Sequence, residues 1–230
     1  MSQPDAALGH ELLDDRRADP DLVRESLRSI ARANRWFGGG AAVRFGLGRA
    51  CAGGNGAPSL TLLDVGTGFG DLPRMAIEWA RRRGIVLKAI GIEHHAAAAA
   101  AARDRGLPTI IGDGAALPFP AASVDLVLLS QIVHHFAPRS AVGLLRECAR
   151  VARRAVIVAD LRRSTLAAVA FPLAGRLLSL DRHAVRDGVT SLRRGFTVAG
   201  LESLMTQAGL GTRVFRRPGA RLVAVGRVES

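Results

Sequence analysis

Acidic, glycine and histidine residues follow several short apolar runs of this chain, where they could bind a ligand and move a proton. The first run, residues 60–65, contains Asp64 and is followed by Gly66, Gly68 and Gly70. Glycines carry no Cβ, so the N–H groups of such a turn can approach a ligand closely. Carboxylates accept hydrogen bonds from ligand hydroxyls, and imidazole accepts a proton near pH 7. Such groups end or follow the later runs: Glu93, Asp113, Ser130, Gln131, His134 and His135.

Strands alternating with helices are expected to bring these residues together. The pattern predicts a mainly parallel sheet with helices on both faces. We expect strands at residues 60–65, 85–92, 109–111, 124–129 and 155–159, and helices at 71–83, 95–105, 139–152 and 198–208. The carboxyl ends of parallel strands meet at one edge of a sheet, so the polar groups should converge there.

A hairpin is predicted to close the sheet. Pro218 and Gly219 favour a turn between strands at roughly residues 211–215 and 221–225. The two strands would run antiparallel, a feature that plain dinucleotide-binding folds lack.

The N-terminal part of the chain is predicted to be helical. Asp19 and Pro20 form a typical helix start, and apolar residues then recur at helical spacing. We interpret this helix as a lid over the mouth of the site. Trp36 and Phe37, in its last turn, either belong to that mouth or anchor the helix in the core.

A glycine-rich loop marks the expected domain boundary. Residues 52–58 follow a second predicted helix at 41–51. We therefore expect a helical lid over residues 1–58 and a catalytic domain over residues 59–230. Residues 161–196 of that domain interrupt the alternation and are expected to be an insertion.

Two motifs resemble those of a known family. The stretch D-V-G-T-G-F-G, from Asp64 to Gly70, resembles the glycine turn of class I S-adenosylmethionine-dependent methyltransferases, in which an acidic residue precedes the first glycine. The stretch from Asp113 to Phe119, followed by Ser123-Val124-Asp125, resembles the quinone-biosynthesis (methyltransferase type 11/12) branch. Its members mostly methylate small molecules. The resemblance implies a Rossmann-like seven-stranded sheet with a C-terminal antiparallel hairpin, and S-adenosylmethionine as cofactor.

The resemblance also implies roles for single residues. Glu93 is expected to bind both ribose hydroxyls, and Asp113 the adenine amino group. Outside the matching stretch, Arg35 is a candidate partner for the methionine carboxylate. The expected cofactor-binding residues are Arg35, Asp64, Gly66, Thr67, Gly68, Gly70, Glu93, Gly112, Asp113, Gly114, Ser130 and Gln131.

The two adjacent histidines are the candidate catalytic residues. His134 and His135 follow the fourth predicted strand, where the methyl acceptor is expected to lie. Methyl transfer from a sulfonium depends mainly on alignment, and an O–H acceptor gains further from a base. We predict that one of the two histidines is this base. The alternative is that they only orient the loop.

The insertion is predicted to form the acceptor pocket with the N-terminal helix. It contains an apolar helical stretch interrupted by Pro172 and a charged loop at residues 181–194. Apolar walls are expected from Phe171, Leu173, Leu177, Leu178 and Leu180, and positive charge from Arg162, Arg163, His183, Arg186, Arg193 and Arg194. The alternative is that the apolar helix forms a dimer interface.

Charge and composition limit the possible partners. The formal net charge of +12 suggests an RNA acceptor as the alternative, but the arginines are scattered and the chain has no tyrosine. No apolar run is long enough to span a membrane. The two cysteines match no metal or redox spacing, so we expect no metal and a cytoplasmic location.

The sequence thus predicts a methyltransferase that acts on oxygen or carbon of a small, apolar, phenolic or polyketide-like metabolite. The alternatives are an RNA methyltransferase and a cofactor-binding protein without catalysis. The protein is expected to be a monomer or a homodimer, with nucleic acid an unlikely partner.

Overall fold

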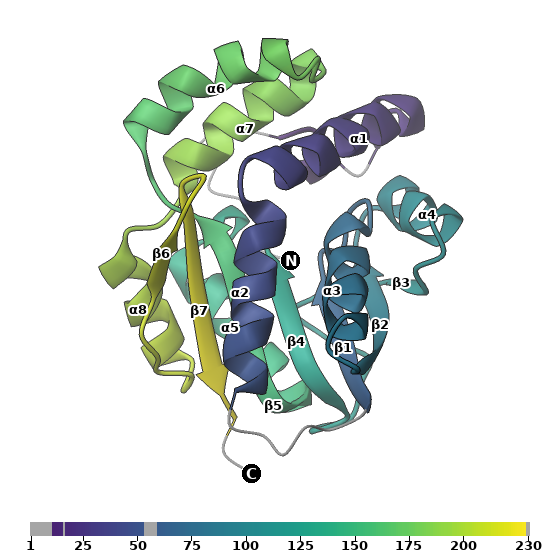
Figure 1. The fold of residues 1–230 in the computed structure, drawn as a ribbon, viewed down its shortest axis with the longest axis vertical. Coiled ribbons are helices and arrows are strands. Elements are labelled where there is room, and N and C mark those ends of the chain that lie inside the picture. Colours follow the sequence, from purple (N-terminus) through teal and green to yellow (C-terminus); the bar gives the residue numbers. More distant parts are fainter. Residues whose placement is uncertain (1–10, 16, 53–58, 229–230) are drawn as a thin grey trace.

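A seven-stranded sheet forms the middle of the molecule (Figure 1). The computed structural model describes residues 11–15, 17–52 and 59–228. The strand order is β3-β2-β1-β4-β5-β7-β6, in which β7 pairs antiparallel with β5 and β6 and the other neighbours are parallel. The predicted fold is therefore confirmed. The strands are β1 (Ser59–Val65), β2 (Val86–Glu93), β3 (Thr109–Ile111), β4 (Val124–Ser130), β5 (Ala152–Leu161), β6 (Phe215–Arg217) and β7 (Arg221–Arg227).

Helices cover both faces of the sheet. One apolar core lies between the strands and α2, α3; the other lies between the strands and α5, α8. Three further helices, α1, α6 and α7, lie over the carboxyl ends of the parallel strands (Figure 1). The helices are η2 (Leu12–Asp14), α1 (Pro20–Trp36), α2 (Gly39–Cys51), α3 (Asp71–Arg81), α4 (Ala96–Asp104), η3 (Val133–His135), α5 (Pro138–Val151), α6 (Thr165–Leu177), α7 (Arg182–Arg194) and α8 (Val198–Gln207).

The predicted charged loop at residues 181–194 is wrong, because this segment is α7. The Asp181 side chain accepts hydrogen bonds from the N–H groups of His183 and Ala184, which caps the helix. The predicted break at Pro172 is also wrong, since α6 continues through it.

The two N-terminal helices have different surroundings. α1 begins where predicted, with the Asp19 side chain capping it. α2 instead packs into the sheet core through Ala42, Val43 and Leu47. The predicted boundary between lid and catalytic domain stays a prediction, and loop residues 53–58 lie outside the described residues.

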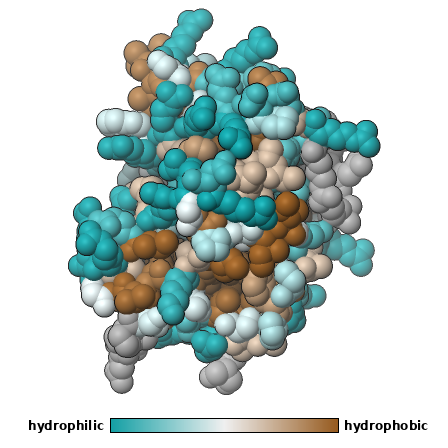
Figure 2. Space-filling view, turned by 90° about the vertical axis from the view of Figure 1, so that its right-hand side faces the viewer, coloured by the Kyte–Doolittle hydropathy of each residue, from teal (hydrophilic) through white to brown (hydrophobic). Residues whose placement is uncertain are grey.

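The structure also bears on membrane spans, on the surface and on the two cysteines. No helix in the described part of the chain is long and apolar enough to cross a membrane. On the face shown in Figure 2, apolar patches are interspersed with hydrophilic side chains. Cys51 and Cys148 are free thiols.

Two helical glycines provide a matched test of the α2–sheet contact. A Cβ on Gly46 would lie 2.5 Å from Ile157 Cγ2, whereas a Cβ on Gly143 of α5 would meet nothing within 4 Å. Replacing Gly143 by alanine should raise the free energy of unfolding by about 0.5–1 kcal/mol, from helix propensity alone. Gly46→Ala gains the same helix propensity but overpacks the core. Its free energy of unfolding should therefore be about 1–3 kcal/mol lower than that of Gly143→Ala. Urea denaturation measures both, and equal stabilities would contradict the close packing of α2 on β5.

Candidate functional site

A cavity of about 360 Å³ opens at the carboxyl edge of the sheet. Its walls come from the glycine turn after β1, from α1, from the β4–η3 segment, from α6 and α7, and from the start of β7. Most of the lining is apolar, including Leu27, Ile30, Phe37, Phe171 and Leu192. The ends of β1, β4 and β5 therefore meet at a largely apolar site, whereas Glu93 and Asp113 are not among the residues that line it.

The glycine turn forms one end of the cavity. Gly66, Gly68 and Gly70 all have positive φ, at 71°, 52° and 69°. The buried Asp64 accepts a hydrogen bond of 2.7 Å from the Thr67 hydroxyl, and burial raises the pKa of Asp64 to about 7. Gly70 also forms the N-cap of α3.

Glu93 lies at the end of β2 beside this turn. Its Oε2 accepts a hydrogen bond from the backbone N–H of Gly68 at 2.9 Å. Its Oε1 accepts from the backbone N–H of His95 at 3.0 Å and also lies 3.1 Å from His94 Nδ1. Burial acts to raise the pKa of Glu93, but these hydrogen bonds outweigh it and lower the pKa. A carboxylate has about four acceptor positions, so Glu93 retains one for a ligand and would gain another if His94 swung away.

The segment after β3 lies next to Glu93. Ile111 pairs with Glu93 in the parallel register, and the N–H of Gly112 donates to the Glu93 carbonyl. Asp113 follows and is half-buried, with one carboxylate oxygen accepting from the N–H of Ala115. A Cβ on Gly114 would lie 2.7 Å from Val65 Cγ1, so glycine allows close packing there. Glu93 and Asp113 thus occupy neighbouring strand ends, as predicted.

An amide chain links α1 to the sheet edge. Asn34 donates to Asp71 at 3.1 Å and accepts from the Gln131 amide at 2.7 Å. Gln131 has a φ of 55°, a strained value for a residue other than glycine, and its N–H donates to the Ala159 carbonyl. Arg35 is exposed and does not line the cavity. The structure therefore brings Asn34, and not the predicted Arg35, into the site.

His134 is held by a buried carboxylate. Nδ1 of its ring lies 2.6 Å from Asp160 Oδ1, and its backbone N–H donates to Asp160 Oδ2 at 3.3 Å. Asp160 also accepts from the N–H of Leu161 at 2.6 Å. Burial acts to raise the pKa of Asp160, while His134 and these hydrogen bonds lower it. With Nδ1–H donating to Asp160, the ring presents Nε2 as an acceptor at the cavity wall.

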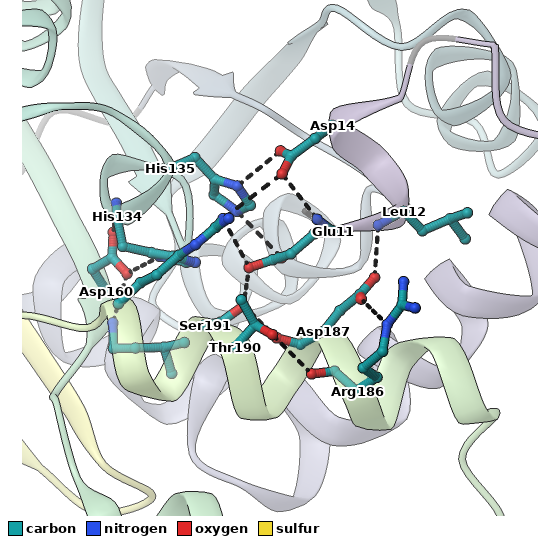
Figure 3. Close-up of polar contacts among 12 residues, drawn as sticks. Glu11, Leu12, Asp14, His134, His135, Asp160, Arg186, Asp187, Thr190 and Ser191 are labelled. Carbon is teal, nitrogen blue, oxygen red and sulfur yellow. Dashed lines mark hydrogen bonds and ion pairs between the residues drawn. The ribbon is translucent and has the colours of Figure 1, made fainter. Parts of the chain in front are cut away.

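His135 belongs to a second polar cluster, shown in Figure 3. Its Nδ1 lies 3.1 Å from Asp14, and its Nε2 lies 3.6 Å from Glu11. Burial acts to lower the pKa of His135, but the bond to Asp14 and the nearby carboxylates raise it. Residues 11–14 also bind α7, because Asp187 accepts from the N–H of Leu12 and Ser191 donates to Glu11. This segment therefore covers the cavity between η3 and α7.

The same cluster has metal-ligand donors, although the sequence predicted no metal. Glu11, His134 and His135 each offer a donor atom within 4.8 Å of the others. Arg194 Nη1 lies 3.3 Å from Glu11 and brings a positive charge that would compete with a cation. Ion pairs account for this arrangement without a metal.

The acceptor wall differs from its prediction. Small residues of α6, Ala167, Ala170 and Ala174, line the cavity beside Phe171 and Leu180. Leu173 and Leu177 instead point outward and are 67% and 79% exposed. Of the six basic residues expected at the wall, none lines the cavity: Arg162, Arg163, His183, Arg186, Arg193 and Arg194. In the last turn of α1, Phe37 lines the cavity and Trp36 is exposed.

Several site residues escaped the sequence analysis. Asp160 ends a predicted strand next to that of Ser130, and this position could have identified it. Arg221 begins a strand antiparallel to its neighbour, so it too lies at the carboxyl edge. Nothing in the sequence indicated that Glu11 and Asp14 reach the site.

The comparisons with known proteins concern the family and the fold. The family model described as a methyltransferase domain matches residues 63–159. No curated protein matches the sequence significantly.

Solved structures resemble the whole fold. An S-adenosylmethionine-dependent methyltransferase from Aquifex aeolicus is 16% identical, with a TM-score of 0.61 over 92% of this chain and 99% of its own. Magnesium protoporphyrin IX methyltransferase from Synechocystis PCC 6803, bound to S-adenosylhomocysteine (SAH), is 16% identical, with a TM-score of 0.57 over 84% of each chain. PigF with SAH is 18% identical, with a TM-score of 0.63 over 96% of this chain and 63% of its own.

The His135–Asp14 pair should make stability depend on pH. Because folding raises the pKa of His135, its contribution is fully present below the unfolded value of about 6.5 and is lost as the pH rises through the folded pKa. Asp14 stays ionised in this range, since its pKa is lowered to about 2. His135→Gln should therefore destabilise the protein more at about pH 5.5 than at about pH 8.5 in urea denaturation.

The control is the same substitution in an Asp14→Asn background, where the pH-dependent part of the loss should shrink. An equal loss at both pH values in the parent protein would contradict the ion pair.

Proposed function

We propose that this class I S-adenosylmethionine-dependent methyltransferase transfers a methyl group to an oxygen or a carbon of a small, largely apolar, phenolic or polyketide-like molecule. The observation that supports this proposal is the cavity of about 360 Å³, which joins the glycine turn to an apolar chamber under α1, α6 and α7. A chamber of this size and lining suits a small ring system. One of the similar structures, the magnesium protoporphyrin IX methyltransferase, is also named for a small ring-containing molecule.

The chain has the features needed to bind the cofactor. The glycine turn leaves its backbone accessible to a ligand at Gly66 and Gly68, where the left-handed φ values favour glycine. Glu93 keeps an acceptor position for a ribose hydroxyl, and Asp113 follows the adjacent strand, as recognition of an adenosyl group requires. Asn34 and Asp71 offer polar groups at the cavity end of the turn.

The remaining proposed binding residues surround the same turn. They are Asp64, Thr67, Gly70, Gly112, Gly114, Ser130 and Gln131. Asn34 replaces Arg35 in this set.

Bound S-adenosylmethionine supplies an electrophilic methyl group, and this chain's residues position the acceptor and move its proton. His134 lines the cavity, and its Nε2 has no hydrogen-bond partner among the described residues. Asp160 fixes the ring so that Nε2 can accept the proton of an acceptor hydroxyl. The apolar walls exclude water from the reacting groups. We assign the base to His134. His135 supports it through ring contact, with the two tilted rings 4.3 Å apart between centroids, and through its own contact with Asp14.

A polyanionic RNA acceptor is not proposed. Among the described residues that line the cavity, Arg221 is the one arginine. The scattered arginines that suggested RNA lie outside this lining, so the net charge does not concentrate at the site.

Replacing Glu93 by glutamine should weaken cofactor binding. The substitution keeps the side chain's size but removes the negative charge that would receive ribose hydroxyls, so the Kd of SAH should rise about tenfold or more. Glu78→Gln is the matched control, because in the described part of the chain Glu78 forms ion pairs with Arg81 and Arg82, at the end of α3, and does not line the cavity. Calorimetry measures both, and an unchanged Kd for Glu93→Gln in a folded variant would contradict the assignment of the ribose site.

Replacing His134 by alanine should lower turnover and leave cofactor binding nearly unchanged. Loss of a general base costs about 10²–10⁴-fold in rate. Transfer of a labelled methyl group to a panel of phenols measures turnover, and SAH calorimetry reports the integrity of the cofactor site. His135→Ala is the comparison and should lose less activity. Full turnover in His134→Ala would contradict the assignment of His134 as the base, and methyl transfer would then depend on positioning alone.

A further inference from the structure

Three residues that line the cavity carry a buried polar atom without a hydrogen-bond partner among the described residues. One of these atoms is Asp187 Oδ1, which lies 3.5 Å from Arg186 Nε in an ion pair. The other two atoms have neither a hydrogen bond nor an ion pair within the described residues. They are Nη1 of Arg221 and Nε2 of His134. Both residues are nearly fully buried, with 4% and 6% of their surfaces exposed. A buried polar atom without a partner is unfavourable, so a ligand that paired with both atoms would be strongly selected.

Arg221 is fixed in place while Nη1 stays unpaired. It is the first residue of β7 and pairs with Leu161 across the antiparallel register. Its Nε donates to the Phe37 carbonyl at 3.2 Å, which anchors one side of the guanidinium. Burial lowers the pKa of Arg221 to about 10, and the charge of Asp160 opposes that shift. Arg221 therefore presents a positive, pre-oriented donor at neutral pH.

The two unpaired atoms have opposite hydrogen-bonding character. Arg221 Nη1 can only donate. His134 Nε2 accepts, because Nδ1 of the same ring is bonded to Asp160. A ligand that satisfies both needs one oxygen that accepts a hydrogen bond and one hydroxyl that donates. A hydroxyl beside a carboxylate or an enolic carbonyl supplies this pair.

The rest of the chamber suits the body of such a molecule. Leu27, Ile30 and Phe37 from α1 face Phe171 and Leu192 from the insertion across the cavity. Phe37 and Phe171 pack edge to face, with ring centroids 5.4 Å apart. Flat apolar rings pack well against such walls.

We propose that Arg221 determines acceptor specificity, and that the acceptor is an aromatic or polyketide-like hydroxyl compound with a carboxylate or carbonyl oxygen adjacent to the hydroxyl. The adjacent oxygen binds Arg221 Nη1, and the hydroxyl donates to His134 Nε2. This inference rests on the proposed function and names the substrate class of the same site.

Three ring compounds test the proposal by calorimetry on the full chain saturated with SAH. 1-Hydroxy-2-naphthoate carries both oxygen groups, 1-naphthol lacks the carboxylate, and 2-naphthoate lacks the hydroxyl. The first should bind at least about tenfold more tightly than either of the others, because each of these leaves one buried atom unpaired. In Arg221→Gln, the ratio by which 1-hydroxy-2-naphthoate binds more tightly than 1-naphthol should fall to about twofold or less.

The matched control is Arg216→Gln, which removes the same charge from the exposed side chain on the neighbouring strand β6. This variant should keep the wild-type preference. Arg221→Lys, which retains the charge but not the fork of donors, should fall between the wild-type protein and Arg221→Gln.

The outcomes separate this inference from the proposed function. Equal binding of 1-hydroxy-2-naphthoate and 1-naphthol by the wild-type protein, or no binding of any of the three, overturns the role of Arg221 without requiring any variant to fold. A preference that survives in Arg221→Gln overturns it as well. Failure of the wild-type protein to bind SAH would instead overturn the proposed function.

Discussion

The buried Asp160 carboxylate is the interaction that fixes His134 at the edge of the cavity. A charge with no exposed surface is tolerated only when its oxygens are paired. Asp160 meets this requirement with the ring and the N–H of His134 and with the N–H of Leu161. The same pairing that makes the charge tolerable also fixes the His134 ring and leaves Nε2 as the acceptor of the ring. Stability and chemistry are therefore coupled at the end of β5.

The cavity is closed by segments that are far apart in the sequence. α1 contributes one wall, the insertion with α6 and α7 contributes another, and residues 11–14 lie between η3 and α7. The contacts between these segments include hydrogen bonds: Ser29 accepts from the N–H of Asp181, and Glu11 accepts from Ser191. Ser29 and Ser191 are buried, so these bonds are shielded from water and hold the walls together.

The cofactor edge follows a different principle from the acceptor chamber. Backbone N–H groups and carboxylates interlock there before any ligand binds, as Gly68 does with Glu93 and Gly112 does with the Glu93 carbonyl. The groups that we propose for adenosyl recognition are thus pre-organised by the parallel register of β1, β2 and β3. The chamber beyond them is shaped mainly by side chains on helices, with Arg221 at the start of β7 as a contribution from the sheet.

The sequence by itself determined most of the strands, the closing hairpin and the carboxylates at successive strand ends, because apolar runs, glycine turns and proline–glycine pairs act locally. Asp64, Glu93, Asp113 and His134 were identified for the same reason. Tertiary structure alone decided that Asn34 and not Arg35 faces the cavity and that the alanine face of α6 points inward. It also brought Glu11, Asp14 and Arg221 to the site. The direction in which a helix turns its faces, and the pairing of residues more than a hundred positions apart, depend on packing against the whole sheet, which no local pattern encodes.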